Sequence, residues 1–200
     1  MKALILCNGQ PPSYELLARH LRGAELILCT DGASRWVQEL GVTPNVLIGD
    51  MDSGALTADC EVIDCGPHDR QEDTDAEKAL RLALDRGATE IVMLGATGLR
   101  LDHTLGNVWL AARYHEQAEI VVADAYGELR VVTGRYALQT RPGARVSLLA
   151  LTADVTLDTE GLKWPLHGPL EPGTRGLSNE AVAEEVVVDV RTGMVAVMTA

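Results

Sequence analysis

Basic residues are scarce in this 200-residue sequence: 17 lysines and arginines stand against 29 aspartates and glutamates, giving a formal net charge of −12. A protein that binds nucleic acid needs a basic face, so this deficit disfavours a DNA or RNA partner. The acidic balance also repels phosphates at long range, which divalent cations can offset by bridging carboxylates and phosphates. Clustered aspartates are therefore candidate metal ligands.

Long apolar runs and paired cysteines are missing as well. No run approaches the ~18 apolar residues of a membrane helix, and the first run ends at Asn8-Gly9, too early for a signal peptide. We therefore expect a cytoplasmic protein without a membrane partner. The four cysteines include no C-x-x-C pair, which disfavours zinc binding and dithiol redox chemistry.

The usual nucleotide fingerprints are also absent. The sequence contains neither G-x-x-x-x-G-K-[ST] nor G-x-G-x-x-G, so it resembles neither the common P-loop ATPases nor the common dinucleotide-binding proteins. No internal repeat or low-complexity segment is visible. Any nucleotide site must therefore be built from other residues.

The first part of the chain alternates strand-sized apolar runs with helical patterns. Strands are predicted at 3–7, 25–30, 46–48, 61–64, 90–94 and 119–124, and helices at 14–21, 33–40, 75–86 and 102–115. The helix at 75–86 has the clearest apolar face, and Gly87 follows it as a stop signal. This rhythm predicts an α/β domain over residues 1–124, with a parallel, Rossmann-like sheet covered by helices on both faces.

The pattern changes near Ala125, after which no helical period is visible. Strands are predicted at 129–133, 136–138, 145–149, 155–157, 185–190 and 195–198, separated by turn signals such as Thr133-Gly134-Arg135 and Arg191-Thr192-Gly193. We therefore expect a second, all-β domain over residues 125–200, an antiparallel β-sandwich or barrel.

Two aspartates follow the short apolar strand at 46–48. Asp50 and Asp52 stand two residues apart after Gly49, so in an extended segment their carboxylates point the same way and repel each other unless a cation lies between them. Ligands of open α/β sheets lie at the carboxyl ends of strands. Oxygen ligands suit Mg²⁺, which takes one or two carboxylates plus substrate phosphates. On spacing alone, a solvated turn with two aspartates explains the pattern equally well.

Two further segments carry candidate site residues. The acidic run at 69–75 precedes the helix at 75–86, and capping of that helix by Asp73 or Thr74 explains only part of its acids. The segment at 95–103 leads from a strand into a helix, where backbone N–H groups can bind phosphate and Arg100 can add a fork of donors. His103 fits a base or a ligand, but such a residue is more often structural.

Taken together, these segments resemble the thiamine pyrophosphokinase family in order and spacing, and the resemblance covers nearly the whole chain. It rests on six elements: Thr30-Asp31-Gly32-Ala33-Ser34-Arg35, Gly49-Asp50-Met51-Asp52-Ser53, Gln71-Glu72-Asp73-Thr74-Asp75, Gly95-Ala96-Thr97-Gly98-Leu99-Arg100-Leu101-Asp102-His103-Thr104, Gly161-Leu162-Lys163-Trp164-Pro165-Leu166 and Gly176-Leu177-Ser178-Asn179-Glu180. Two positions depart from the family pattern. Glu72 stands where Asp is frequent, and Asp31 aligns one position after the family's Asp, so neither receives a role.

The resemblance implies an activity and an assembly. It implies transfer of pyrophosphate from ATP to the hydroxyl of thiamine, with Mg²⁺, by a homodimer whose active site lies at the subunit interface. Asp50, Asp52 and Asp75 match the family's metal-binding and catalytic carboxylates, and Arg100 matches a catalytic and nucleotide-binding position. Among the three, Asp75 is our preferred acceptor of the hydroxyl proton.

The resemblance also implies the remaining site residues. Those expected to contact the nucleotide or its phosphates are Gln71, Thr97, Arg100, Asp102 and His103. Those expected in the thiamine pocket are Trp164, Ser178 and Asn179. Thiamine is a flat aromatic cation, and Trp offers the best π-face for such a ligand, whereas position alone favours packing of Trp164 in the β domain.

Two other functions compete with this interpretation. A pyrophosphokinase acting on a pterin alcohol would share the acidic segments but would not need the elements at 161–166 and 176–180. A non-catalytic thiamine or nucleotide sensor would keep Trp164 but lose the carboxylates, whereas Asp50, Asp52 and Asp75 are all present. The sequence therefore favours the enzyme that acts on thiamine.

Overall fold

The computed structural model describes residues 1–51, 59–65 and 73–200. The chain divides into two compact units, Met1–Ala125 and Tyr126–Ala200, and each has a hydrophobic core of its own. Within the described ranges, no helix is long and apolar enough to cross a membrane. The chain is thus a mixed α/β protein with both parallel and antiparallel strands.

The first unit contains a parallel sheet. Its strands are β1 (Lys2–Leu6), β2 (Leu26–Thr30), β3 (Val46–Gly49), β4 (Glu61–Asp64), β5 (Glu90–Leu94) and β6 (Glu119–Asp124). They lie in the order β6-β5-β1-β2-β3-β4, and every neighbouring pair is parallel, as predicted. The central strands are buried along most of their length, which explains why they read as continuous apolar runs.

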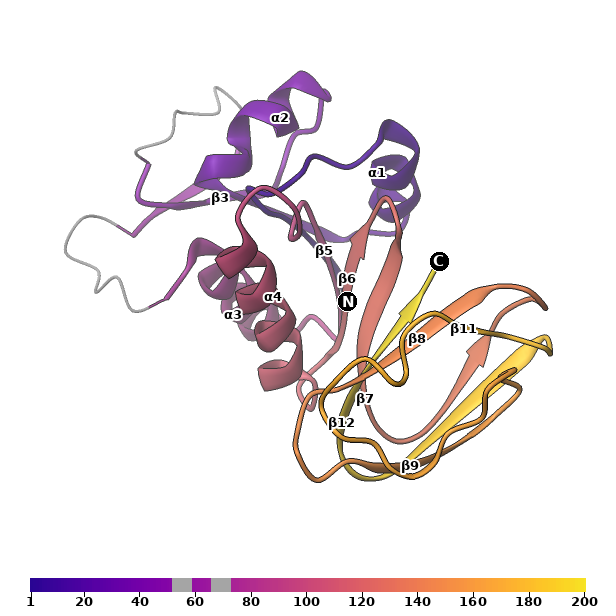
Figure 1. The fold of residues 1–200 in the computed structure, drawn as a ribbon. Coiled ribbons are helices and arrows are strands. Elements are labelled where there is room, and N and C mark those ends of the chain that lie inside the picture. Colours follow the sequence, from indigo (N-terminus) through magenta and orange to yellow (C-terminus); the bar gives the residue numbers. More distant parts are fainter. Residues whose placement is uncertain (52–58, 66–72) are drawn as a thin grey trace. The chain divides into compact units, whose positions relative to one another are not determined.

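Helices lie on both faces of this sheet (Figure 1). They are α1 (Tyr14–Leu21), the short 3₁₀ helix η1 (Asp31–Ala33), α2 (Ser34–Glu39), α3 (Asp75–Asp85) and α4 (Leu101–Tyr114). Leu17 of α1 and Val37 of α2 share a buried cluster with Leu4 and Leu6 of β1, so α1 and α2 cover one face. On α3, four of the five side chains predicted to form the apolar face are buried against β1, β2 and β3, and the fifth, Leu84, is half-buried. The four are Ala76, Ala79, Leu80 and Ala83.

The order of the strands creates a switch point at β1. The chain passes from β1 to its neighbour β2, and after β4 it returns to the other side of β1 as β5. The chain that leaves β1 therefore continues toward one side of the sheet, and the chain that leaves β5 continues toward the other. In open α/β sheets, ligands bind in the crevice outside the carboxyl ends of the strands at such a point.

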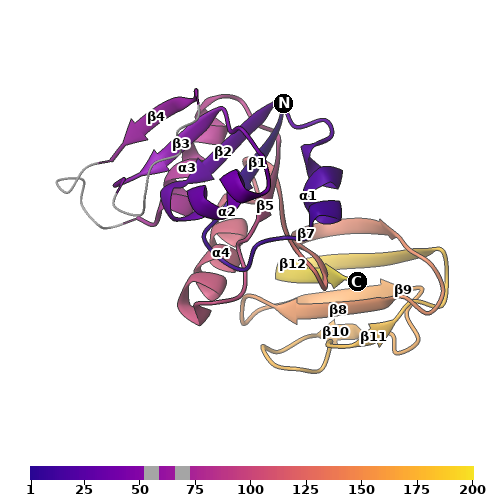
Figure 2. The same ribbon diagram turned by 90° about the horizontal axis from the view of Figure 1, so that it is seen from above.

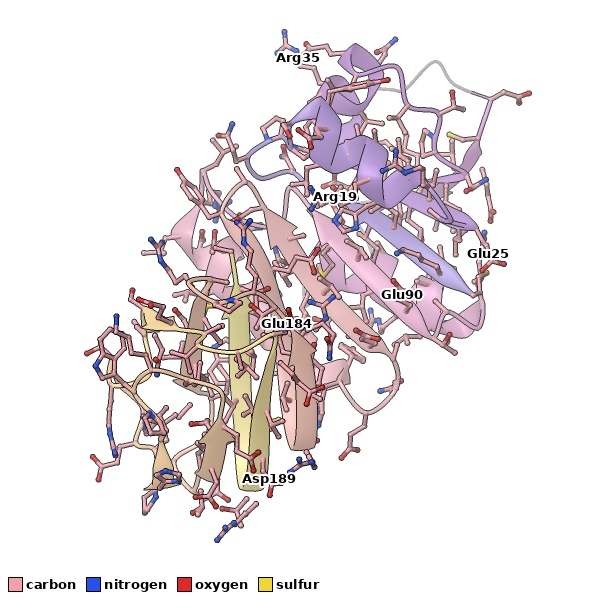
Figure 3. The ribbon with its side chains drawn as sticks, turned by 90° about the vertical axis from the view of Figure 1, so that its right-hand side faces the viewer. Arg19, Glu25, Arg35, Glu90, Glu184 and Asp189 are labelled. Atoms are coloured by element: carbon pink, nitrogen blue, oxygen red, sulfur yellow. The ribbon has the colours of Figure 1, made fainter. Side chains whose placement is uncertain are left out.

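The second unit is entirely antiparallel (Figure 2). Its strands are β7 (Gly127–Gln139), β8 (Arg145–Ala150), β9 (Thr156–Glu160), β10 (His167–Pro169), β11 (Asn179–Glu180) and β12 (Glu185–Thr199). β12 pairs with β7 along both of its halves, with β9 through its first half and with β8 through its second half. The alternating side chains that face inward form the core, while charged ones such as Asp189 lie on the outside (Figure 3).

Two predicted turns in this unit are wrong. The segments at 129–133 and 136–138 form one strand, β7, and those at 185–190 and 195–198 form one strand, β12. Gly134 and Gly193 have φ values of 72° and 77°, and the register of β12 against β7 shifts between Val190 and Val195. A bulge uses the same glycine signal as a turn but leaves the strand continuous. The short strands β10 and β11 were not predicted.

Candidate active site

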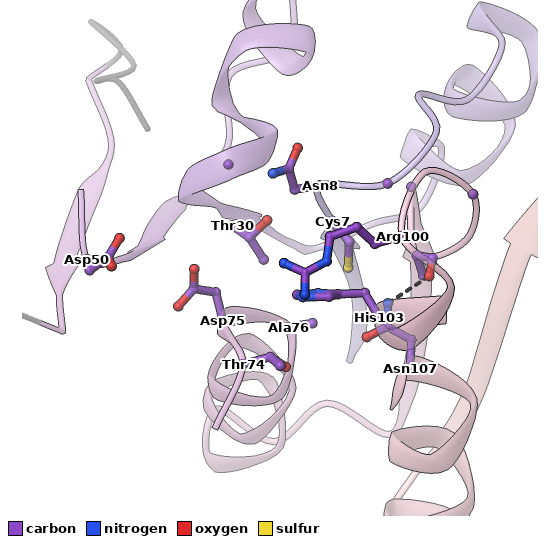
Figure 4. Close-up of a pocket in the computed structure, with 15 residues that line it drawn as sticks. Cys7, Asn8, Thr30, Asp50, Thr74, Asp75, Ala76, Arg100, His103 and Asn107 are labelled. Atoms are coloured by element: carbon purple, nitrogen blue, oxygen red, sulfur yellow. Dashed lines mark hydrogen bonds between the residues drawn. The ribbon is translucent and has the colours of Figure 1, made fainter. Parts of the chain in front are cut away.

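A pocket of about 240 Å³ lies at the carboxyl ends of the parallel strands, beside the switch point at β1 (Figure 4). The segments that follow β1, β2, β3 and β5 contribute to it, together with the first turns of α3 and α4. The residues that line it are Cys7, Asn8, Gly9, Thr30, Gly32, Asp50, Thr74, Asp75, Ala76, Gly95, Ala96, Gly98, Arg100, His103 and Asn107. All of them belong to the first unit.

Two loops run close together on one side of this pocket. The Gly9 N–H donates to the Gly95 carbonyl at 2.6 Å, and the Gln10 N–H donates to the Thr97 carbonyl at 2.7 Å. A Cβ atom at Gly9 would lie 2.3 Å from the Gly95 oxygen, so only glycine permits this approach. The loop from 95 to 100 then enters α4, and the N-terminus of a helix favours phosphate through its free N–H groups and its dipole.

Three carboxylates lie close together on the other side of the pocket. A Cβ atom at Gly49 would lie 2.5 Å from the Asp31 Cβ atom and 3.2 Å from Asp75 Oδ2, so the end of β3 separates the two side chains only narrowly. Asp50 follows Gly49 and lines the pocket with Asp75. Burial raises the pKa of Asp75, and the charges of Asp50 and Asp31 raise it further, against the opposing effect of Lys78.

Lys78 pairs with one member of this group. Its Nζ atom lies 3.4 Å from Asp75 Oδ1, one turn along α3. Burial disfavours the ionised form of Asp75 more than Lys78 favours it, so the pKa of this carboxyl stays raised.

Arg100 supplies positive charge at the opposite edge, where Figure 4 shows its side chain alongside that of His103. Its Nε and Nη2 atoms donate to the two carboxylate oxygens of Asp102 at 3.1 and 2.5 Å. This ion pair lowers the pKa of Asp102 to about 2. Both side chains are exposed, so the guanidinium remains accessible to a phosphate ligand.

Thr97 and Asn107 hold the loop between β5 and α4 in place. The Thr97 hydroxyl donates to Asp124 Oδ2 at 2.9 Å, and Thr97 is not among the lining residues. The buried Asn107 donates from Nδ2 to the Ala96 carbonyl at 2.7 Å (Figure 4). The structure thus brings Arg100 and His103 to the pocket but directs the Thr97 hydroxyl elsewhere.

The carboxylates suit a hard divalent cation by their chemistry. Among the described residues, no group of three or more His, Cys, Asp or Glu side chains is arranged to hold a metal by itself. Mg²⁺ requires only one or two carboxylates, because substrate phosphates and water complete its shell. Asp50 and Asp75 meet that requirement. The predicted ligand Asp52 and the predicted contact Gln71 lie outside the described residues, as does Glu72.

The second unit carries the predicted thiamine-binding residues. Trp164 is 55% exposed, and its backbone N–H and carbonyl both bond to the side chain of Asn179. Ser178 is exposed and has a φ of 55°, with its N–H donating to Ser147 Oγ at 2.9 Å. The structure therefore places these three residues together at one corner of the unit.

Two asparagines that line the pocket were not predicted as site residues: Asn8, which follows β1, and Asn107, which fixes the loop before α4. Asp31, a buried residue near Asp75, does not line the pocket itself. In the sequence, Asn8-Gly9 indicates only the end of a strand, and Asp31 receives no role. The rule that strand ends carry ligands would have identified both, had the strand order been known.

The chain is similar in sequence to known proteins over most of its length. The family description "Thiamin pyrophosphokinase, catalytic domain" matches residues 17–122, and "Thiamin pyrophosphokinase, vitamin B1 binding domain" matches residues 135–195. Thiamine pyrophosphokinase 2 of Arabidopsis thaliana is 30% identical over 92% of this chain and 80% of its own length. Thiamine pyrophosphokinase 1 of the same plant is 29% identical over 82% and 72%.

Solved structures share the fold along the whole chain. Thiamine pyrophosphokinase from Bacillus subtilis has a TM-score of 0.85 at 20% identity, covering 100% of this chain and 99% of its own. The enzyme from Geobacillus thermodenitrificans has a TM-score of 0.84 at 25% identity, covering 100% and 97%. The yeast protein has a TM-score of 0.78 at 16% identity, covering 100% and 86%.

Proposed function

The chain belongs to the thiamin pyrophosphokinase family, and we infer from this membership that it transfers pyrophosphate from ATP to the hydroxyl of thiamine, giving thiamine diphosphate and AMP. In this reaction the hydroxyl oxygen attacks the β-phosphorus of ATP, the bond from that phosphorus to the α-phosphate oxygen breaks, and AMP leaves. Little covalent chemistry is required of the protein, so positioning and charge neutralisation supply most of the rate.

The pocket of the first unit is proposed as the site for ATP. Arg100 binds phosphate oxygens and stabilises the charge that develops on them, with His103 and Asp102 beside it. The N–H groups at the start of α4 add to this stabilisation. The observation that supports this role is the placement of the exposed guanidinium at the same pocket as the carboxylates of Asp50 and Asp75.

The carboxylates have two proposed tasks. Asp50 and Asp75, with Asp52, would hold Mg²⁺, which neutralises phosphate charge when bound. Asp75 is also the proposed acceptor of the hydroxyl proton, because a raised pKa brings a carboxylate closer to the pH at which a general base is effective. Gln71 is proposed to lie near the acceptor substrate.

The second unit is proposed to bind thiamine. Its sequence matches the vitamin B1 binding domain of the family, and Trp164 offers an exposed indole to a cationic ring. We accordingly propose an ATP and Mg²⁺ domain over residues 1–124 and a thiamine domain over residues 125–200. The free state of all four cysteines supports a location in the reducing cytoplasm.

We propose further that the protein is a homodimer with its active site at the subunit interface. On α4, Leu101, Leu105 and Trp109 are spaced by four residues, lie on one face of the helix, and are 73%, 54% and 53% exposed. Such a row of exposed apolar side chains supports association with a second copy. Light scattering should give the mass of a dimer, and Leu105→Glu should give a monomer.

The experiment that tests the function measures AMP release from ATP and Mg²⁺ with and without thiamine. We expect AMP only with thiamine, and thiamine diphosphate in equal amount. Release of AMP with a pterin alcohol instead of thiamine would contradict the proposed acceptor. Binding of thiamine without any AMP would indicate a sensor.

A further inference from the structure

Both backbone polar groups of Trp164 bond to a single side chain. Asn179 is 4% exposed on β11, and its Oδ1 atom accepts from the Trp164 N–H at 3.2 Å and from the Glu180 N–H at 2.9 Å. Its Nδ2 atom donates to the Trp164 carbonyl at 2.6 Å. Both polar atoms of Asn179 are therefore engaged with the main chain, whereas a residue that contacts a substrate directly would present one of them to the ligand.

The indole of Trp164 is also fixed, through its neighbour Lys163. The Lys163 Nζ atom lies 4.9 Å from the centroid of the ring and 3.0 Å from Glu180 Oε2. The Lys163 N–H donates to the Glu180 carbonyl at 2.8 Å, which ties the two residues together. One face of the ring is thus covered by an ammonium whose charge is paired, while more than half of the Trp164 surface stays exposed.

We propose that Asn179 is a positioning residue that acts on thiamine only through Trp164, and that the Lys163–Glu180 pair leaves a single face of the indole for the substrate. This inference rests on the proposed function, because it takes thiamine as the ligand. A flat cation gains attraction from the ring face on which it stacks. The Glu180 carboxylate offsets the Lys163 charge, which would otherwise repel a second cation on the opposite face.

The proposal predicts a particular pattern of kinetic constants. Trp164→Ala should raise the KM for thiamine about tenfold, the effect expected from loss of a cation–π contact. Asn179→Ala should raise it severalfold, and both variants should leave the KM for ATP unchanged. Asn179→Asp keeps the shape of the side chain but sets a buried carboxylate against the Trp164 carbonyl, so it should raise the KM for thiamine at least as much as Asn179→Ala.

A double-mutant cycle separates positioning from direct contact. If Asn179 acts only through Trp164, adding Asn179→Ala to Trp164→Ala should cause no further loss in kcat/KM for thiamine. Effects that multiply would show that Asn179 touches thiamine itself, and would overturn the proposal. Glu180→Gln should raise the KM for thiamine more at low ionic strength than at high, because it leaves the Lys163 charge unbalanced.

The matched control is Thr159→Val. The buried Thr159 hydroxyl accepts from the Leu166 N–H at 2.8 Å, so it anchors the other end of the same loop without bonding to Trp164. We expect this variant to lose stability but to keep its KM for thiamine. An equal rise in that KM would mean that any loosening of the loop weakens thiamine binding, and it would contradict a specific role of Asn179.

The results also distinguish failure of this proposal from failure of the proposed function. If the wild type neither binds nor converts thiamine, both are wrong. If the wild type is active but the effects of Asn179→Ala and Trp164→Ala multiply, only this proposal is wrong.

Discussion

Burial raises the pKa of Asp75, and the charges of Asp50 and Asp31 raise it further, whereas Arg100 lowers the pKa of Asp102, at the start of α4, to about 2. The difference arises from the surroundings, since Asp75 is half-buried near two carboxylates whereas Asp102 is exposed beside a guanidinium. The first carboxyl is costly to ionise in the folded protein and the second is not. Perturbed carboxyls of this kind mark functional sites.

Replacement of Asp75 should separate stability from activity. In EDTA at pH 7, Asp75→Asn should raise the free energy of unfolding by roughly 0.5–1 kcal/mol, because it removes a poorly solvated charge near two others. Thiamine-dependent AMP release should fall at least about 100-fold, because the variant loses a proposed Mg²⁺ ligand and the proposed acceptor of the hydroxyl proton. Urea unfolding and the AMP assay measure the two effects.

The dependence on pH has a definite sign. The folded-state pKa of Asp75 lies above the ordinary value of 3.8, so the folded protein binds this proton more tightly than the unfolded chain does. The contribution of the protonated Asp75 carboxyl to the stability of the folded protein is therefore complete below pH 3.8 and is lost as the pH rises through the folded-state pKa. The advantage of Asp75→Asn over wild type should therefore vanish in acid. An advantage that grows in acid would contradict this assignment.

Arg100 should not be replaceable by another cation. Its fork of donors can bind two oxygens of a phosphate at once, which an ammonium cannot do. We expect Arg100→Lys to lower kcat by roughly 100-fold, the usual cost of losing one donor to developing charge. Asp102→Asn should have a smaller effect, because it leaves the guanidinium in place. Steady-state kinetics at saturating ATP compares the two variants, and an equal loss in both would point to the ion pair itself as the required feature.

The sequence identified the residues of the pocket that come in recognisable groups. Asp50 and Asp75 were found because each stands in an acidic segment, and Arg100 and His103 because they follow glycines at the start of a helix. Asp31 belongs to the recognised element at 30–35 but receives no role from the sequence, because it aligns one position after the family's Asp. Its closeness to Asp75 depends on β2 and β3 being neighbours, which only the fold determines.

At the scale of elements, the first turn of α3 links helix stability to the pocket. Thr74 caps this helix by accepting from the Glu77 N–H at 3.3 Å, and the next residue is Asp75. Ser13 caps α1 in the same way, accepting from the Leu16 N–H at 3.2 Å, and does not line the pocket. The two caps therefore form a matched pair, since they make the same kind of hydrogen bond but only Thr74 lines the candidate active site.

Removal of each cap should cost stability equally but activity unequally. Thr74→Ala and Ser13→Ala should each lower the free energy of unfolding by about 1 kcal/mol. Only Thr74→Ala should also lower kcat, because fraying of α3 displaces the Asp75 carboxylate. Urea unfolding and steady-state kinetics of both variants test this. A similar loss of kcat in Ser13→Ala would attribute the effect to general destabilisation.

Elements with one strong local signal were predicted well. The range of α1 was predicted correctly because Ser13 caps it and its apolar residues keep a helical period, and β5 was predicted correctly because it is apolar on both faces. β7 and β12 were each divided in two, since a glycine in the left-handed region has the same sequence signature in a bulge as in a turn. β11 was missed because two residues carry no periodicity at all.

At the scale of the whole molecule, the proposed dimer can be tested by asking whether each active site uses one unit from each of the two chains. Asp75→Asn disables the first unit and Trp164→Ala weakens the second. If each site combines one unit from either chain, a mixed dimer of the two variants retains one intact site. After subunit exchange, an equimolar mixture should regain about a quarter of wild-type activity at low thiamine, from random pairing with one working site per mixed dimer.

The control for this experiment mixes each variant with itself. No recovery in the mixture, with dimers verified by light scattering, would mean that each site lies within one chain. Recovery would also show that neither variant had lost its fold, because the intact site draws one unit from each.

The position of β1 between β2 and β5 has a consequence for how the protein reaches its native state. The strands β1 and β2 are close in the sequence, so their pairing closes only a short loop. Pairing of β1 with β5 joins Lys2 to Glu90, and the hydrogen bond between Met1 and Thr89 likewise spans 88 positions. Closure of so long a loop is entropically costly and slow. The pocket needs both β1 and β5, so we expect nucleotide binding to return late during refolding. Binding of a fluorescent ATP analogue, followed over time, would measure when this pairing is complete.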